Sequence, residues 1–148
     1  MYGRILVPVD GSSTAAAGLR EAIRLAKDQG AALRVMHVVD KMAIVGVIEA
    51  GMNPRPVLAK LARSGRAVLD AARRSAKKLG VAADTVLHEP VTKRVADDVL
   101  REAKTWKADL IVMGTHGRRG VRRMVLGSDA EQVVRLAEIP VLLVRGRS

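Results

Sequence analysis

Several residue types that often carry chemistry are missing or scarce in this chain of 148 residues. There is no cysteine, which excludes disulfide bonds, thiolate catalysis and cysteine-ligated zinc. One tryptophan and one tyrosine are the only aromatic residues, so the chain lacks the stacking surface on which single-stranded nucleic acids are held. No apolar run reaches the length of about 18 residues that a membrane-spanning helix needs, and we expect no membrane partner.

Sequence motifs of common enzyme classes are absent as well. The chain contains no G-x-G-x-x-G dinucleotide fingerprint, no G-x4-G-K-[ST] phosphate loop and no G-x-S-x-G nucleophile elbow. His37, His88 and His116 lie on separate segments without the spacing of metal ligands. The sequence therefore offers no evident activated nucleophile or general base, and we assign no catalytic residue.

The composition is that of a folded domain. Apolar residues make up 49% of the chain, and its length is sufficient for one domain with a continuous core. The first residues lead directly into the apolar segment Ile5–Val9, which leaves no room for a signal peptide. We therefore expect a single cytoplasmic domain.

The formal net charge of +11 favours anionic partners such as nucleic acids, acidic surfaces or nucleotide phosphates. The 26 lysine and arginine residues are spread along the chain, and aromatic residues are scarce, which makes specific nucleic-acid binding an unlikely role. A solvated basic surface is the simpler interpretation.

Apolar residues alternate between strand-like and helix-like periods along the chain. This alternation predicts an α/β fold with an open parallel sheet of five strands and helices on both faces. In such sheets, ligands bind beyond the carboxyl ends of the strands, where the strand order reverses. The expected strands are Ile5–Val9, Leu33–Val39, Asp84–Leu87, Leu110–Met113 and Val141–Val144, and the expected helices are Ala16–Ala26, Leu58–Leu79, Val95–Trp106 and Ala130–Ala137.

The segment 40–56 interrupts this alternation. It is too apolar for a solvated loop, and its glycines and prolines break it too often for a long helix. It is interpreted as an apolar insertion, either a flap packed on the domain, a lid over a ligand or a contact between subunits.

The most informative feature is the glycine spacing that follows the expected strand Leu110–Met113. Gly114, Gly117, Gly127 and Ser128 form the pattern G-x2-G-x9-G-S, which ends at the start of an expected helix. Glycines allow backbone N–H groups to approach a ligand closely, and a helix N-terminus adds N–H donors and a positive dipole end. The pattern predicts a site for an anion, most often a phosphate.

The residues around this spacing are similar to those of a known family. The similar segments are Ile5–Ser12 (ILVPVDGS), His37–Val39, Ala108–Arg118 (ADLIVMGTHGR), Leu126–Ser128 and Pro140–Val144, which together extend over nearly the whole chain. On these segments the chain resembles the universal stress protein family, and the glycine spacing resembles that of its ATP-binding branch. The resemblance implies one domain over residues 1–148, with a Rossmann-like sheet of the adenine nucleotide alpha hydrolase type and strand order 3-2-1-4-5.

The resemblance also implies a set of site residues. Asp10 would lie near the ribose and phosphates and could hold Mg²⁺ or Mn²⁺, while the backbone of Val38 would meet the adenine. Gly127 and Ser128, with the two N–H groups that follow, would hold the phosphates. For His37, a packed strand residue is a better interpretation than a ligand contact. The full implied set is Pro8, Val9, Asp10, Val38, Met113, Gly114, His116, Gly117, Arg118, Gly127, Ser128, Asp129 and Ala130.

Two of these positions have an alternative interpretation. Ser128 and Glu131 fit a capping box, in which Ser128 would be the N-cap residue and no ligand would be required. Asp129 and Ala130 depart from the usual family pattern. As a consequence, the carboxylate of Asp129 would repel a phosphate bound there. Nearby arginines, Arg118 among them, could offset this repulsion because guanidinium groups suit phosphates.

Taken with the resemblance, the sequence predicts an ATP-binding regulatory protein of the stress response, acting with a partner protein that the sequence does not identify. The alternatives are a slow ATP-hydrolysing enzyme and a basic scaffold that binds nucleic acid or acidic partners without nucleotide. The apolar strand Val141–Val144 is expected at a sheet edge, where it would pair with a second copy to form a homodimer.

Overall fold

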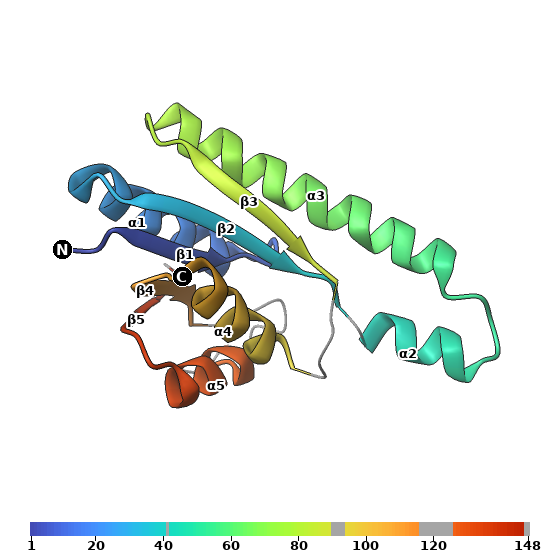
Figure 1. The fold of residues 1–148 in the computed structure, drawn as a ribbon. Coiled ribbons are helices and arrows are strands. Elements are labelled where there is room, and N and C mark those ends of the chain that lie inside the picture. Colours follow the sequence, from blue (N-terminus) through green and yellow to red (C-terminus); the bar gives the residue numbers. More distant parts are fainter. Residues whose placement is uncertain (41, 90–93, 116–125, 147–148) are drawn as a thin grey trace.

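The computed structural model describes residues 1–40, 42–89, 94–115 and 126–146, which form one five-stranded sheet with helices on both faces (Figure 1). All strand pairs are parallel, and the order β3-β2-β1-β4-β5 confirms the predicted fold. The strands are β1 (Arg4–Pro8), β2 (Ala32–Val38), β3 (Ala83–His88), β4 (Leu110–Gly114) and β5 (Val141–Val144), and the helices are α1 (Ser13–Gln29), α2 (Met42–Glu49), α3 (Arg55–Lys78), α4 (Val95–Trp106) and α5 (Ser128–Leu136).

The central strands divide their side chains between two hydrophobic clusters. In β1, Ile5 and Val7 face α1 and α3, while Leu6 faces α4 and α5, and all three are fully buried. This alternation is the two-residue period of a strand, and it explains why the central strands are apolar at nearly every position. The two-sided burial fixes the register and so the place where each strand ends.

The segment 40–56 contains the short helix α2. This helix and the first part of α3 project beyond the carboxyl ends of β2 and β3 (Figure 1). Only Ile44 of α2 is buried, while Met42, Val45, Ile48 and Met52 are exposed. The described part of this segment is therefore mostly exposed in the single chain. Among the described residues, no helix has the length and apolar composition needed to cross a bilayer.

One non-glycine residue among those described has a positive φ, Lys107, which ends α4 with φ 57° and ψ 47°. Its backbone N–H donates to the carbonyl oxygen of Lys104 at 3.2 Å. The left-handed conformation costs a residue with a Cβ about 1 kcal/mol relative to glycine.

We expect Lys107→Gly to stabilise the protein by about 1 kcal/mol, because glycine adopts this conformation without strain. Chemical denaturation of both proteins measures the difference. Lys104→Gly is the matched control and should destabilise by about 1 kcal/mol, since Lys104 lies inside the helix. Equal stability of Lys107→Gly and the unsubstituted protein would contradict the argument.

Candidate functional site

The strand order reverses between β1 and β4, and the two strands separate at their carboxyl ends. Their register is limited to two pairs, Ile5 with Leu110 and Leu6 with Ile111, although β4 continues to Gly114. Beyond these pairs, Pro8 has no N–H to donate, and the N–H of Val9 donates to the carbonyl oxygen of Met36 in β2 at 2.8 Å. The ends of β1 and β4 therefore lie at the edge where open α/β sheets bind ligands, and we call the region beyond these two ends the crevice.

The turn after β1 places Asp10 at this edge. An Asp10 carboxylate oxygen accepts the backbone N–H of Ser12 at 2.9 Å, and the Ser12 hydroxyl accepts the N–H of Ala15 at 3.1 Å. Ser12, not Asp10, is therefore the N-cap of α1. Gly11 lies between them with φ 84°, which favours glycine. This chain of bonds fixes the Asp10 carboxylate beside the start of a helix.

The neighbouring wall of the crevice comes from the end of β2. His37 is buried, and its Nδ1 lies 2.8 Å from the carbonyl oxygen of Val9, which ties β2 to β1. Gly65 of α3 makes room for the ring, since a Cβ there would come within 2.7 Å of it. His37 is thus a packed strand residue, as expected. Val38 follows it and is half-buried against the cluster under α4 and α5.

Gly114, at the end of β4, is required by backbone packing. A Cβ at this position would lie 2.5 Å from the carbonyl oxygen of Thr14, in the first turn of α1. The contact is also close from the side of the helix, because a Cβ on Gly18 would lie 3.0 Å from the N atom of Gly114. These two glycines let α1 contact β4 directly, so its first turn lies beside the crevice.

A pair of backbone hydrogen bonds holds the start of α5 against the end of β4. The Gly127 N–H donates to the carbonyl oxygen of Thr115 at 2.7 Å, and the Thr115 N–H donates to that of Val144 at 3.0 Å. Residues 116–125 lie outside the described part of the chain, and with them the predicted site residues His116, Gly117 and Arg118.

The predicted capping box at the start of α5 is wrong. Gly127 is the N-cap residue, with φ −59° and ψ 148°, and its carbonyl oxygen accepts the N–H of Glu131 at 2.9 Å. Ser128 is therefore already helical, and the Glu131 carboxylate bonds to Arg135 at 3.3 Å instead of reaching back. The cap lies one residue earlier because Gly127 is the residue held by Thr115. As a result, no side chain caps this helix among the described residues.

The described site residues form two groups along this edge. Val9 and Met113 are each 7% exposed, and with Val38 and Pro8 they form an apolar group at the carboxyl ends of β1, β2 and β4. Ala130 is buried in the cluster under α4 and α5. The polar group consists of Asp10 at the end of β1 and the α5 start, Gly127, Ser128 and Asp129.

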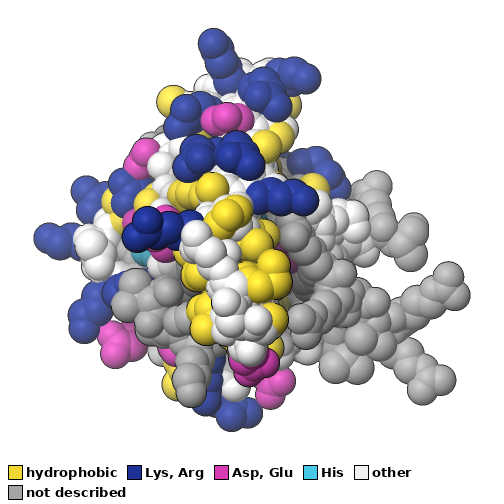
Figure 2. Space-filling view, turned by 90° about the vertical axis from the view of Figure 1, so that its right-hand side faces the viewer, with side chains coloured by type: hydrophobic (Ala, Val, Ile, Leu, Met, Phe, Trp, Pro, Cys, Tyr) yellow, Lys and Arg dark blue, Asp and Glu magenta, His cyan; other side chains and the backbone are white. Residues whose placement is uncertain are grey.

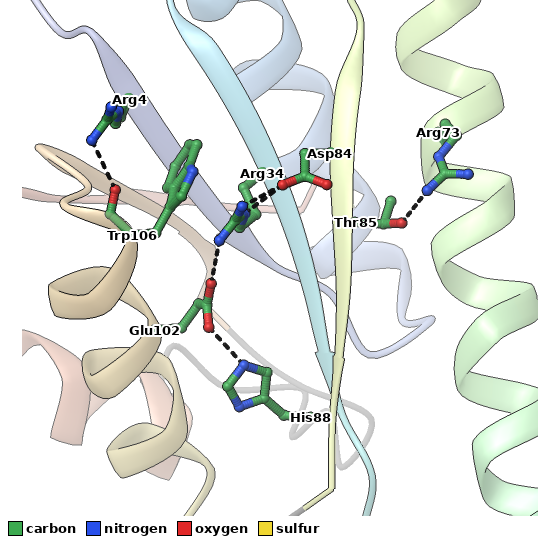
Figure 3. Close-up of polar contacts among 8 residues, drawn as sticks. All are labelled: Arg4, Arg34, Arg73, Asp84, Thr85, His88, Glu102 and Trp106. Atoms are coloured by element: carbon green, nitrogen blue, oxygen red, sulfur yellow. Dashed lines mark hydrogen bonds and ion pairs between the residues drawn. The ribbon is translucent and has the colours of Figure 1, made fainter.

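The structure also contains a polar network that the sequence analysis missed (Figure 3). On the α4 face of the sheet, the Glu102 carboxylate accepts from Arg34 at 2.7 Å and lies 2.7 Å from His88 Nε2. Arg34 also bonds to Asp84 and stacks 4.7 Å from the centre of the Trp106 ring. Burial opposes the charge of Arg34, but the hydrogen bonds to Glu102 and Asp84 prevail and raise its pKa. One signal was available, namely a single charged residue inside an otherwise apolar strand.

We expect Arg34→Met to destabilise the protein by about 2 kcal/mol, because it leaves the Glu102 carboxylate, 8% exposed, without its guanidinium partner. Thermal or urea unfolding measures the loss. Adding Glu102→Gln to that variant should recover part of it, since a neutral amide costs less to bury than a carboxylate. No loss in the single variant would show that the network contributes nothing to stability.

Comparison with known proteins identifies the family. The sequence model of the universal stress protein family matches residues 1–145, and the chain belongs to this family. It is 35% identical over 145 residues to the universal stress protein MJ0531 of Methanocaldococcus jannaschii, covering 98% of this chain and 83% of that protein.

Solved structures share the fold. Protein MJ0577 superposes with a TM-score of 0.85 at 24% identity, covering 100% of this chain and 99% of that one. A universal stress protein from Archaeoglobus fulgidus, in complex with dAMP, matches with a TM-score of 0.66 at 24% identity over 97% and 98% of the two chains. A further universal stress protein structure, in complex with cAMP, matches with a TM-score of 0.72 at 21% identity over 99% of both chains.

Proposed function

We propose that this protein binds an adenine nucleotide, with ATP preferred, and acts as a nucleotide-dependent regulator in the stress response. The observation that carries the proposal is the bond between Gly127 and Thr115, which holds the start of α5, capped by no described side chain, beside the ends of β1 and β4. Uncapped N–H groups and the helix dipole favour an anion there. The complexes of two family members with dAMP and cAMP support an adenine nucleotide as the ligand.

In this proposal the phosphates bind the first N–H groups of α5, from Ser128 onward. Asp129 and Glu131 lie in the same first turn and partly counteract the dipole that attracts a phosphate. The adenine lies toward β2, where Val38 supplies backbone groups and Pro8 and Val9 supply apolar contact. The side chains at this end of the crevice suit an apolar ring.

A divalent cation fits this arrangement only as part of the nucleotide complex. Asp10 contributes a carboxylate, and the described residues contain no cluster of three potential ligands that would hold a metal by themselves. Mg²⁺ is commonly held by one or two carboxylates together with substrate phosphates and water. In the proposed complex, Mg²⁺ or Mn²⁺ would screen the repulsion between Asp10 and the phosphates.

Calorimetric titration tests the proposed function. ATP should bind more tightly than GTP, and magnesium should strengthen ATP binding to the unsubstituted protein more than to Asp10→Ala. Absence of binding by either nucleotide would reject the nucleotide-binding function. An unchanged magnesium effect in Asp10→Ala would reject the metal role alone.

We also propose a homodimer formed through β5. Within the described part of the chain, this strand pairs with β4 alone and lies at the end of the sheet, where its four apolar residues are half-buried in the single chain. An apolar edge strand of this kind readily pairs with a second copy. Light scattering should give twice the chain mass of 15.9 kDa, and Leu143→Pro should give the single-chain mass. A dimer that persists in this variant would place the interface elsewhere.

A further inference from the structure

Helix α2 lacks the polar face that a surface helix normally has. Glu49 is its single charged residue, yet most of the helix is exposed. Its large exposed side chains are Met42 (66%), Val45 (36%) and Ile48 (56%), and Met52 (65%) follows directly. A helix that is apolar on all sides is ordinarily buried, so this one is expected to insert its exposed side into an apolar environment.

The helix that follows carries a strong positive charge on one side. All eight basic residues of α3 are exposed, against a single acidic residue, Asp70, so α3 supplies +7 of the net charge of +11. At 3.6 residues per turn they fall within a sector of about 140°, along a helix about 36 Å long. These residues are Arg55, Lys60, Arg63, Arg66, Arg73, Arg74, Lys77 and Lys78.

The two features meet on one face of the molecule. Helix α2 contacts α3, and the first part of α3 extends beyond the sheet with it (Figure 1). Figure 2 shows this face, where apolar side chains run down the centre and lysine and arginine side chains lie above and beside them. Glu49 and the exposed Asp40 are the acidic residues of the apolar segment, and Arg55, Lys60 and Arg63 outnumber them nearby.

We propose that this face, α2 together with the basic side of α3, is a peripheral binding surface for an anionic lipid bilayer. The exposed apolar residues of α2 would enter the boundary between headgroups and acyl chains, and the basic residues in the first half of α3, Arg55, Lys60, Arg63 and Arg66, would contact the anionic headgroups. An eight-residue helix is about 12 Å long, so α2 lies in the surface and does not span it.

Charge and shape favour this partner over two others. A second copy of the chain would bring the same basic helix against α3, and like charges oppose such a contact. Duplex nucleic acid would satisfy the basic residues of α3 but would leave the apolar residues of α2 exposed to water. A bilayer surface satisfies both groups, and it adapts to a projecting helix without requiring a matching groove.

Sedimentation with vesicles tests the proposal on the full chain. Vesicles of phosphatidylcholine with phosphatidylglycerol should carry the protein down, and vesicles of phosphatidylcholine alone should not. High salt should reduce binding, because the headgroup attraction is screened. Ile48→Glu should weaken binding by about tenfold, as expected for the loss of one buried aliphatic side chain.

The matched control is Leu79→Glu, which makes the same charge change at an exposed aliphatic residue (48%) at the far end of α3. This variant should retain most of the binding, and both variants should bind ATP like the unsubstituted protein if they are folded. Failure of the unsubstituted protein to bind anionic vesicles would overturn the proposal. So would equal losses in both variants, or retention by duplex DNA in place of vesicles.

Discussion

Ser128→Pro is expected to weaken ATP binding by about ten- to a hundredfold while leaving the ligand-free fold intact. Proline removes the backbone N–H at the first position of α5, where a hydrogen bond to a charged phosphate is worth about 1.5–3 kcal/mol. The fold should tolerate the change because Ser128 occupies the position where proline suits a helix. Gly127, with φ −59° and ψ 148°, already has the conformation favoured before proline.

Two measurements make this prediction specific. Calorimetry with ATP gives the affinity, and a thermal melt without ligand shows whether the fold is retained. Ser128→Val is the control, since it has a side chain of similar size and keeps the N–H, so it should bind ATP far better than the proline variant. Unchanged affinity in a folded Ser128→Pro protein would remove the α5 start from the phosphate site.

Gly114→Ala is expected to destabilise the protein by about 3 kcal/mol or more, because the new Cβ would lie 2.5 Å from the carbonyl oxygen of Thr14. The atom it meets belongs to the backbone of α1, which cannot move aside as a flexible side chain can. The first turn of α1 must therefore shift away from β4, which would also alter the edge of the crevice. Urea unfolding measures the loss of stability.

Gly46→Ala serves as the matched substitution. Gly46 lies within α2, and nothing lies within 4 Å of the position its Cβ would occupy. This variant should be as stable as the unsubstituted protein or more stable by up to about 1 kcal/mol, since alanine favours a helix. If Gly114→Ala is equally well tolerated, the close contact between α1 and β4 does not constrain the site.

Much of the fold was predictable because the central strands are buried on both faces. Apolar residues at nearly every position of Ile5–Val9 and Leu110–Met113 predict two-sided burial, and the intervening helical periods then require a parallel sheet. The strand order 3-2-1-4-5 came from the family resemblance, and the structure confirms it. Element boundaries were close, and β5 was predicted at Val141–Val144, where it lies.

Other features depend on contacts that local sequence does not contain. The capping-box prediction failed because the bond from Gly127 to Thr115 moved the cap one residue earlier, and these two residues are 12 positions apart in the sequence. The ion pair of Glu102 with Arg34 likewise joins residues that are 68 positions apart in the sequence. The glycine spacing predicted an anion site. The close packing of Gly114 against the backbone of Thr14 could not be predicted, because it depends on where α1 lies relative to β4.

Mapping backbone amide signals by NMR during an ATP titration tests the central claim most directly. The account predicts that the amides of Ser128, Asp129 and Ala130 shift strongly, together with those of Asp10 and Val38 at the same edge. The amides of Gly3 and Asp109, which meet at the opposite end of the sheet, should remain unchanged. Shifts confined to that opposite end, or the absence of any shift at saturating ATP, would contradict a nucleotide site at the start of α5.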